Sequence, residues 1–288
     1  MQKVAKADWR AIAQIFNQSL LKRLAFDTEM SSLKAVAGYA LSQSNLASLP
    51  LGKLLDQLYE LLTINYRSEY VYKNVVAQKI AIERHVTVQA RLITEFRVNQ
   101  SKADAVVLNG TSTVYEIKTE YDDLARLTGQ LADYKKAFDR IYVVTHGSGA
   151  DKLIRMVHSS IGIIVLNDGM LLDTLREAES NLPNVDPLTI FDSLREREYL
   201  DILKSYLEFT PQGSRYDWHY QCRKMFETLS REDAHTGMLN ALKARTKKSE
   251  FLDFVRELPS SMTAIGLASE ISIAQQARIL ERLASPLI

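Results

Sequence analysis

The chain has 288 residues, of which 46% are hydrophobic and 25% are charged, and its formal net charge is +1. A net charge so close to zero argues against a protein that coats nucleic acid by charge alone, so any nucleic-acid site has to be local. No apolar run approaches the roughly 18 residues that span a bilayer, and the segment MQKVAKADWR lacks the apolar region of a signal peptide. We therefore expect a cytoplasmic protein that does not bind membranes.

Several kinds of chemistry are disfavoured by the residues that the sequence lacks. Cys222 is the single cysteine, which excludes an internal disulfide and a cysteine-based zinc finger. His219 lies nearby, but two soft ligands without partners do not make a zinc site, so we interpret this pair as structural. The patterns GxxxxGK[ST], GxGxxG, HExxH and GxSxG do not occur, which disfavours nucleotide-cradling loops, metalloproteases and esterases.

The N-terminal part of the chain has the apolar spacing of helices. This spacing predicts helices over residues 9–24, 31–42 and 51–62. Ser68 is predicted to cap a further helix with Glu69 in its first turn. The apolar stripe of that helix is formed by Val71, Val75, Val76 and Ile80.

The middle of the chain changes to the period of strands. Alternation predicts a strand over residues 86–98 with one buried face. Asn109-Gly110 is a strong hairpin signal, and the runs on either side of it, residues 104–108 and 113–119, are predicted as its strands. The segments that follow are predicted as a helix over 121–139, a buried strand over 141–146, a helix over 151–159 and a buried strand over 162–167.

These elements predict an α/β fold with a mixed sheet in the order helix-β-β-β-helix-β and with helical N- and C-terminal additions. We expect an N-terminal helical region over residues 1–65, the core over 66–168 and a mainly helical region over 169–288. The last region is interrupted at the turn-forming segments NLPNVDP, TPQGSRYDW and LPSSM.

Three residues around the predicted hairpin carry chemistry. Glu116 and Lys118 are two residues apart on one strand, so their side chains project from the same face. Asp104 begins the neighbouring strand, and a twisted antiparallel pair can bring its carboxylate beside Glu116. Together with the carbonyl of Ile117, the two carboxylates could hold Mg²⁺, a hard cation that prefers oxygen ligands. Such an ion activates water, and Lys118 could position that water or stabilise transition-state charge, so the chemistry is phosphodiester hydrolysis.

At these residues the sequence resembles the PD-(D/E)XK nuclease superfamily, and within it an uncharacterised bacterial family of nucleases of this type. The resemblance covers about residues 66–168 and implies a restriction-endonuclease-like core. Its acidic residue corresponds to Asp104, and its Glu-x-Lys element corresponds to Glu116-Ile117-Lys118, while Ala103 stands at the proline position. Gln130 and Tyr134 resemble the Gln-x-x-x-Tyr element of the exonuclease branch.

The resemblance also implies an additional acid at the metal site, for which the candidates are Glu69 and, as the alternative, Glu95. A structural role competes with each of these assignments. Glu69 in a first helical turn also offsets the helix dipole, and Gln130 and Tyr134 are also suited to a half-buried helix face. Four basic residues form a surface of the same predicted helix, for which a solvated face is the default interpretation and contact with phosphates is the alternative. They are Arg126, Lys135, Lys136 and Arg140.

The resemblance implies a deoxyribonuclease that depends on Mg²⁺ or Mn²⁺, with a role in defence or in conflict between mobile elements. RNA remains open as the substrate, because the chemistry does not require DNA. The alternative function is a catalytically silent nuclease fold that binds nucleic acid or a protein as a regulatory subunit. A protein partner or a second copy of the chain would bind through the helical regions.

Overall fold

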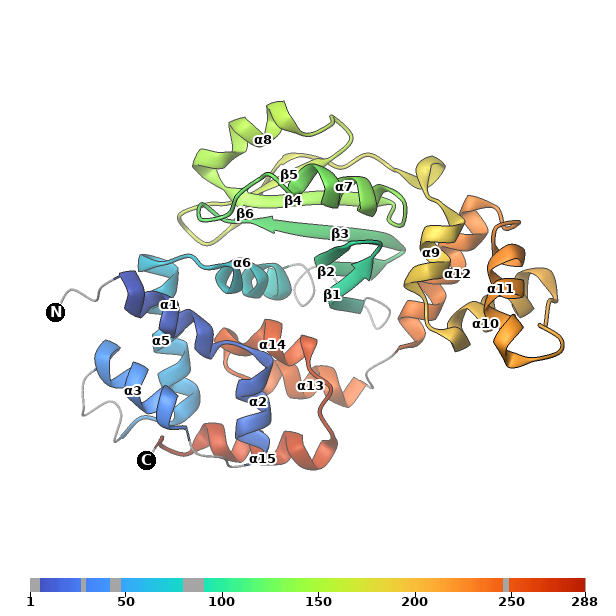
Figure 1. The fold of residues 1–288 in the computed structure, drawn as a ribbon. Coiled ribbons are helices and arrows are strands. Elements are labelled where there is room, and N and C mark those ends of the chain that lie inside the picture. Colours follow the sequence, from blue (N-terminus) through green and yellow to red (C-terminus); the bar gives the residue numbers. More distant parts are fainter. Residues whose placement is uncertain (1–5, 27–29, 42–47, 80–90, 246–248, 288) are drawn as a thin grey trace. The chain divides into compact units, whose positions relative to one another are not determined.

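A computed structural model describes residues 6–26, 30–41, 48–79, 91–245 and 249–287, which belong to two compact units (Figure 1). The first unit contains both ends of the chain, residues 1–84 and 247–288, and the second contains residues 85–246. The limits of these units differ from the predicted region limits near residues 65 and 168. The reason is that the last helices of the chain pack with the first ones. Within the described stretches, no helix is long and apolar enough to cross a membrane.

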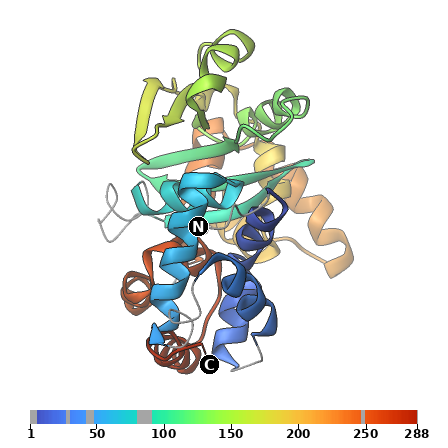
Figure 2. The same cartoon turned by 90° about the vertical axis from the view of Figure 1, so that its left-hand side faces the viewer.

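The first unit is helical. Its elements from the N-terminal side are α1 (Lys6–Ile15), α2 (Gln18–Ala25), α3 (Ser31–Ala40), α5 (Leu51–Asn65) and α6 (Glu69–Val76). The C-terminal side adds α13 (Ser249–Glu257), a 3₁₀ turn (Ser260–Met262), α14 (Thr263–Ala268) and α15 (Ile273–Ala284). α15 packs against α2 and α5 (Figure 2). The buried amide of Asn74 joins α6 to α14, since it donates to the Ser260 carbonyl and accepts from the Ala264 N–H, both at 2.9 Å.

The helix predicted over residues 9–24 is divided into α1 and α2. The Asn17 side chain accepts a hydrogen bond from the Ser19 N–H at 2.8 Å, and this local bond starts a new helix. Ser68 does stand at the N-cap of α6, but its hydroxyl makes no capping hydrogen bond. Its carbonyl accepts from the Val71 N–H instead. Ile80 lies outside the described residues.

The second unit contains a six-stranded mixed sheet in the order β1-β2-β3-β4-β5-β6. The strands are β1 (Arg91–Val98), β2 (Ser101–Asn109), β3 (Thr111–Lys118), β4 (Arg140–His146), β5 (Gly162–Leu166) and β6 (Leu172–Arg176). β1, β2 and β3 are antiparallel neighbours, β4 and β5 run parallel to β3, and β6 returns antiparallel at the edge. The predicted mixed sheet in an α/β fold with helical additions is thereby confirmed.

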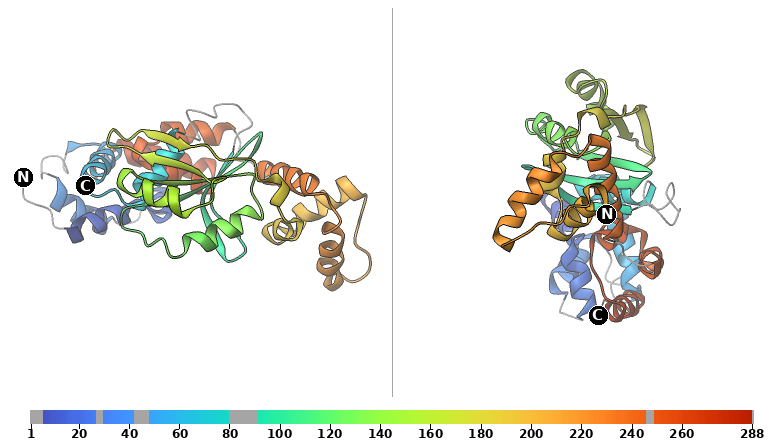
Figure 3. Two further views of the ribbon diagram at one scale, coloured as in Figure 1. Left: turned by 90° about the horizontal axis from the view of Figure 1, so that it is seen from above. Right: turned by 90° about the vertical axis from the view of Figure 1, so that its right-hand side faces the viewer.

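Helices cover this sheet and close its core. α7 (Leu127–Lys135) connects β3 to β4, and α8 (Ala150–Met156) connects β4 to β5, so both lie on the same face (Figure 1). Beyond the sheet follow α9 (Pro187–Ser193), α10 (Glu196–Leu207), α11 (Arg215–Phe226) and α12 (Arg231–Ala244) (Figure 3). α9 packs on β1 and α12 on β2, and one hydrophobic core continues from the sheet into these helices. A buried hydrogen bond of 2.7 Å joins Ser112 on β3 to His235 on α12.

Asn109-Gly110 forms the predicted hairpin between β2 and β3, where Gly110 takes the positive φ of 72° that such a turn requires. The helix predicted over 121–139 begins only at Leu127. The Asp122 carboxylate accepts from both the N–H and the hydroxyl of Thr119, each at 2.8 Å, and this holds the chain in a turn. The segment 172–176, predicted to lie in a mainly helical region, is the strand β6. Its side chains are mostly exposed, so it has no apolar period to reveal it.

Gly162 at the start of β5 tests the packing of this sheet. A Cβ at this position would lie 2.3 Å from the ring of Tyr142, which is itself stacked on Tyr115. We expect Gly162→Ala to lower the free energy of unfolding by about 1–3 kcal/mol, the usual cost of overpacking. Gly129→Ala on the exposed side of α7 is the matched control, because its Cβ would meet nothing within 4 Å. This control should stabilise by about 0.5–1 kcal/mol. Equal unfolding midpoints in denaturant for the two variants would contradict the packing at Gly162.

Candidate functional site

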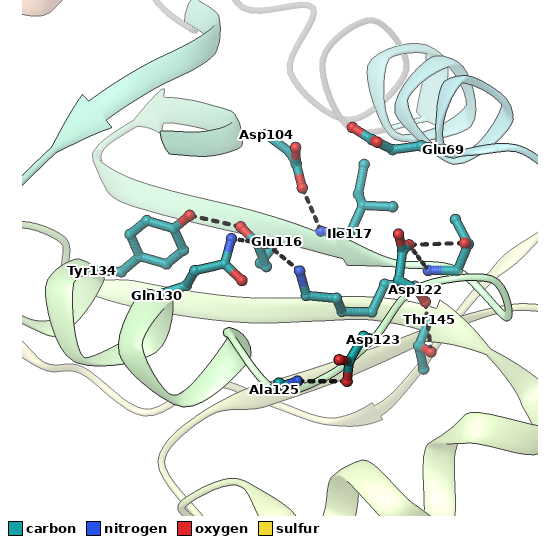
Figure 4. Close-up of polar contacts among 12 residues, drawn as sticks. Glu69, Asp104, Glu116, Ile117, Asp122, Asp123, Ala125, Gln130, Tyr134 and Thr145 are labelled. Carbon is teal, nitrogen blue, oxygen red and sulfur yellow. Dashed lines mark hydrogen bonds and ion pairs between the residues drawn. The ribbon is translucent and has the colours of Figure 1, made fainter. Parts of the chain in front are cut away.

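The predicted site residues of β3 and α7 converge on the carboxylate of Glu116 (Figure 4). Its Oε1 accepts hydrogen bonds from Lys118 Nζ at 2.8 Å and from Gln130 Nε2 at 2.6 Å. Its Oε2 accepts from the Tyr134 hydroxyl at 2.7 Å. The two-residue spacing on the strand and the four-residue spacing on the helix therefore place these side chains together, as the periodicities of the two elements require.

Burial makes these three donors necessary. Only 2% of Glu116 is exposed, and Lys118 is buried as well. A buried charge is costly unless it is paired and hydrogen-bonded, so the ammonium, the amide and the phenol together keep this carboxylate in the interior. A carboxylate offers about four acceptor positions. Three are used, and no described residue donates to the fourth, which lies on Oε2.

Tyr134 is held as a hydrogen-bond donor. Burial, first, and then the neighbouring Glu116 charge raise the pKa of its hydroxyl far above the ordinary value. The charge of Asp104 acts in the same direction, which places that carboxylate in the same electrostatic environment. Tyr134 is therefore protonated at neutral pH, where it donates to Glu116.

Gln130 contributes one satisfied and one unsatisfied group. Its Nε2 donates to Glu116, which fixes the orientation of the amide, because the opposite orientation would place two oxygens together. Its Oε1 is then a buried acceptor without a partner among the described residues. Buried acceptors are normally satisfied by protein or by water, so this oxygen is available to a bound water or ligand.

Asp104 lies where the pairing of β2 with β3 ends. The pairs run from Asn109↔Thr111 to Ala105↔Tyr115, so that Asp104 and Glu116 are the next residues along the two strands. Beyond this point the Ile117 N–H donates its hydrogen bond to the side-chain carboxylate of Asp104, at 2.8 Å, rather than to a backbone carbonyl of β2. Asp104 is half-buried, unlike Glu116, so it forms the more accessible part of the site.

An irregularity in β1 accompanies this change. Glu95 has a positive φ of 60°, which is rare for a residue with a side chain. Its neighbours Thr94 and Phe96 pair with β2, and the residue between their partners is Asp104. Glu95 therefore lies across from Asp104, at the one position in β1 that takes a left-handed backbone.

At the same level, β1 and β2 each change which of their two faces is turned to the core. Ile93 and Phe96 both pack into the core although they are three residues apart, and Ala103 and Val106 on β2 do the same. A regular strand alternates faces with period two and cannot do this. Both strands therefore switch faces at the level of Glu95 and Asp104, so Asp104 is not drawn into the apolar core.

The two candidates for an additional acid have local partners of their own. Glu69 is in the first turn of α6 in the first unit, where its carboxylate pairs with Lys73 at 2.7 Å. Glu95 forms an ion pair with Lys102 of β2. The site described here is made by residues of the second unit, and participation of either acid stays a prediction.

The oxygen donors at this point suit a hard cation. In the described part of the chain, no group of three or more His, Cys, Asp or Glu side chains could hold a metal. Two carboxylates are nevertheless a usual protein contribution to Mg²⁺, which keeps several waters and binds substrate phosphate. Asp104 and Oε2 of Glu116 could serve as these two carboxylates. The Ile117 carbonyl is on the same side of the strand as its N–H, which donates to Asp104, so it could be a further oxygen ligand. Zinc, which prefers nitrogen and sulfur, does not fit.

Sequence reasoning missed two residues that fix the end of β3. The buried hydroxyl of Thr145 on β4 donates to the Lys118 carbonyl at 2.9 Å. Its partner could not be read from the sequence, because parallel pairing joins distant segments. Asp122 anchors Thr119 and so sets where the chain leaves the strand. The short spacing of a threonine and an aspartate in TEYDD is the signal that could have identified this turn.

A family model described as bacteriophage P4 protein cII matches residues 63–269, which is well over half of the chain. The chain belongs to the phage P4 cII family. The cII match contains every residue of the site, from Asp104 to Tyr134, together with the whole sheet and helices α9 to α12.

Individual relatives of the chain are similar to it over shorter stretches. Protein cII of Enterobacteria phage P4 is 32% identical over 63 residues, which is 22% of this chain and 24% of that protein. The alignment thus spans about a quarter of the length of the cII protein. Among solved structures, a protein of unknown function from Silicibacter pomeroyi aligns with 50% of this chain and 94% of its own, at 14% identity and a TM-score of 0.31.

The positive φ of Glu95 predicts an unusual order of stability. Gly adopts this backbone without strain, whereas a residue with a Cβ pays about 1–2 kcal/mol for it. Glu95→Gly and Glu95→Ala both remove the carboxylate and its ion pair. We expect the glycine variant to be more stable than the alanine variant by about 1 kcal/mol, measured by denaturant unfolding. In an ordinary strand alanine is the more stable of the two, and that order would show that the irregularity beside Asp104 is absent.

Proposed function

We propose that this member of the cII family is a metal-dependent nuclease of the PD-(D/E)XK type, which hydrolyses phosphodiester bonds of DNA. The observation that carries the proposal is the convergence of Asp104, Glu116 and Lys118 at the end of the β2–β3 pairing, with Gln130 and Tyr134 of α7 fixed on Glu116. A buried acid and an ammonium beside a more accessible acid are the groups that such hydrolysis requires.

Asp104, Glu116 and the Ile117 carbonyl would hold Mg²⁺ or Mn²⁺. When bound, the ion would polarise the phosphoryl oxygens and make a bound water more acidic. In the chain, Asp104 is half-buried, and its Oδ2 accepts from the Ile117 N–H at 2.8 Å. The carboxylate is thus oriented before any ligand arrives, which lowers the cost of binding.

Lys118 would act on the reacting groups themselves. Its Nζ is held by Glu116 Oε1 at 2.8 Å, and an ammonium has three donors, so it can also bind the attacking water or a phosphoryl oxygen. Charge developing on that oxygen would be stabilised more strongly here than in water, because the ammonium is buried. Gln130 and Tyr134 would position Glu116, and through it both Lys118 and the cation.

The proposal extends to the substrate, the cell compartment and the biological role of the protein. The partner is DNA, with RNA as the second substrate to test, and the cell compartment is the cytoplasm. The matching family is described by a bacteriophage protein, which agrees with a role in defence or in conflict between mobile elements. The helical parts of the chain would bind a partner protein or a second copy.

A second candidate function is a catalytically silent nuclease fold that binds nucleic acid or a protein. Two observations favour it: the described residues bring together only two acids rather than three, and three donors already occupy Glu116. A silent fold would need the Glu116 network for stability alone. Substituting a residue of this network would then lower the stability of the protein, and no catalytic activity would be affected.

Lys118→Met separates the two candidates. We expect it to lower the cleavage rate at least about a hundredfold, the usual effect of removing one such electrostatic group. Lys102→Met is the matched control: it removes a lysine from the neighbouring strand β2 that is paired with Glu95 rather than with the site. The rate is measured on linear, circular, single-stranded and branched DNA and on RNA, with Mg²⁺, Mn²⁺ or EDTA. Breaking the buried pair costs stability, so both variants are assayed well below their melting temperatures.

Cleavage by wild type that is retained in Lys118→Met would remove this lysine from the mechanism. Binding of nucleic acid without cleavage of any substrate, in either metal, would overturn the nuclease proposal in favour of the silent fold.

A further inference from the structure

Helix α11 carries a stripe of side chains that folding does not use. Tyr216, Tyr220 and Lys224 are spaced four residues apart, so they lie along one face of the helix. Tyr216 is 92% exposed and Tyr220 is 72% exposed, and Lys224 is exposed as well. These three residues are called the tyrosine stripe below.

The opposite face of α11 carries its fully buried side chains. Cys222 and Phe226 are fully buried, and each lies two residues beyond a member of the stripe, which is about 200° around the helix. α11 packs against α9 and α10 through this inner face, and α9 in turn contacts β1 (Figure 3). Neither tyrosine hydroxyl of the stripe is hydrogen-bonded to a described residue. Two large rings at the surface of one helix therefore have no function in the fold.

The charges on α11 distinguish the kinds of partner that the stripe fits. Arg215 pairs with Glu196 at 2.7 Å and Arg223 pairs with Asp192 at 3.4 Å, so both arginines are already neutralised. Lys224 forms no ion pair with a residue in the described ranges. The stripe thus ends in a lysine that is free to contact an anion.

We propose that the tyrosine stripe binds a single-stranded segment of nucleic acid, with bases stacked on Tyr216 and Tyr220 and a phosphate near Lys224. This inference rests on the proposed nuclease function, because it assigns the stripe to the substrate of that enzyme. Exposed aromatic rings beside a cation are the means by which proteins bind single strands without reading their sequence.

The composition of the stripe favours nucleic acid over protein. Protein interfaces are enriched in tyrosine but depleted in lysine, and their centres add aliphatic side chains. The stripe has a lysine and no aliphatic residue. A duplex buries its base faces, so it has nothing to place on the rings. The two tyrosines are separated by roughly 6 Å along the helix axis, about twice the spacing of stacked bases, which suits an unstacked strand.

The test measures binding in EDTA, so that it does not depend on cleavage. The affinity of the full chain for a labelled oligothymidylate, and for a duplex DNA, is measured by fluorescence anisotropy at several salt concentrations. We expect Tyr216→Ala and Tyr220→Ala each to weaken binding of the single strand by roughly fivefold or more. The double Tyr→Phe variant should bind as wild type does, because stacking does not need the hydroxyl. Tyr39→Ala is the matched control, since Tyr39 is an equally exposed helical tyrosine of the first unit.

Lys224→Gln tests the phosphate contact separately. It should reduce the slope of log Kd against log salt by about 0.7, the value for one contact with a single strand. An unchanged slope would remove Lys224 from the interface. Equal affinity of wild type and the double Tyr→Ala variant for oligothymidylate would overturn the proposal, and a change in sedimentation of that variant would then identify the stripe as a protein interface.

Failure of this inference can be told apart from failure of the proposed function. If wild type cleaves DNA while the tyrosine variants bind normally, the nuclease stands and the stripe has no role in it. If no nucleic acid is cleaved but the tyrosine variants lose single-strand binding, the inference about the stripe holds, and the protein is one that binds nucleic acid without catalysis.

Discussion

The carboxylate of Glu116 is the group on which the arrangement of the second unit depends. It is almost fully buried, and its charge is compensated by an ammonium from its own strand and by an amide and a phenol from α7. Because an uncompensated buried charge is strongly destabilising, the orientation of α7 over the sheet is coupled to this one residue. The bonds from Gln130 and Tyr134 fix the position of Glu116, and Glu116 in turn holds Lys118 at 2.8 Å. Structure and proposed chemistry therefore use the same contacts, which is why a catalytically silent descendant of such a site would still keep them.

Asp104 is positioned differently from Glu116. A local loss of regular strand structure, rather than a set of buried hydrogen bonds, determines where its carboxylate lies. The ladder between β2 and β3 stops at Ala105, and across from Asp104 the backbone of Glu95 turns left-handed. Both neighbouring strands change the face that they turn to the core at this level. Residues held in strained conformations concentrate at functional sites, where the surrounding structure has to maintain them. A carboxylate at a place where two strands change face stays half-buried and does not enter the apolar core.

The sequence allowed the parts of this site that depend on local periodicity to be predicted. The spacing of Glu116 and Lys118 on a strand, the spacing of Gln130 and Tyr134 on a helix, and the Asn109-Gly110 turn each follow from backbone geometry alone. The rest depends on contacts between distant segments. Thr145 reaches Lys118 through parallel pairing, and β6 is recognisable as a strand only by its pairing with β5. The left-handed Glu95 has no signal in its residue type, since glycine or asparagine would be expected there. The division of the chain into units was also hidden, because the last helices complete the core of the first ones.

Cation binding tests the central claim most directly, since the account requires Asp104 and Glu116 to act together on a metal. The measurement is the melting temperature of wild type and Asp104→Asn across a series of Mn²⁺ concentrations. The amide oxygen of Asn can still accept from the Ile117 N–H, so the variant keeps the local structure. A cation at 100 times its Kd adds about 2.7 kcal/mol to the stability of the state that binds it. The account predicts a clear rise of the wild-type melting temperature with Mn²⁺ and a much smaller rise for Asp104→Asn. Equal shifts in the two proteins, or no shift in wild type at millimolar Mn²⁺, would contradict it.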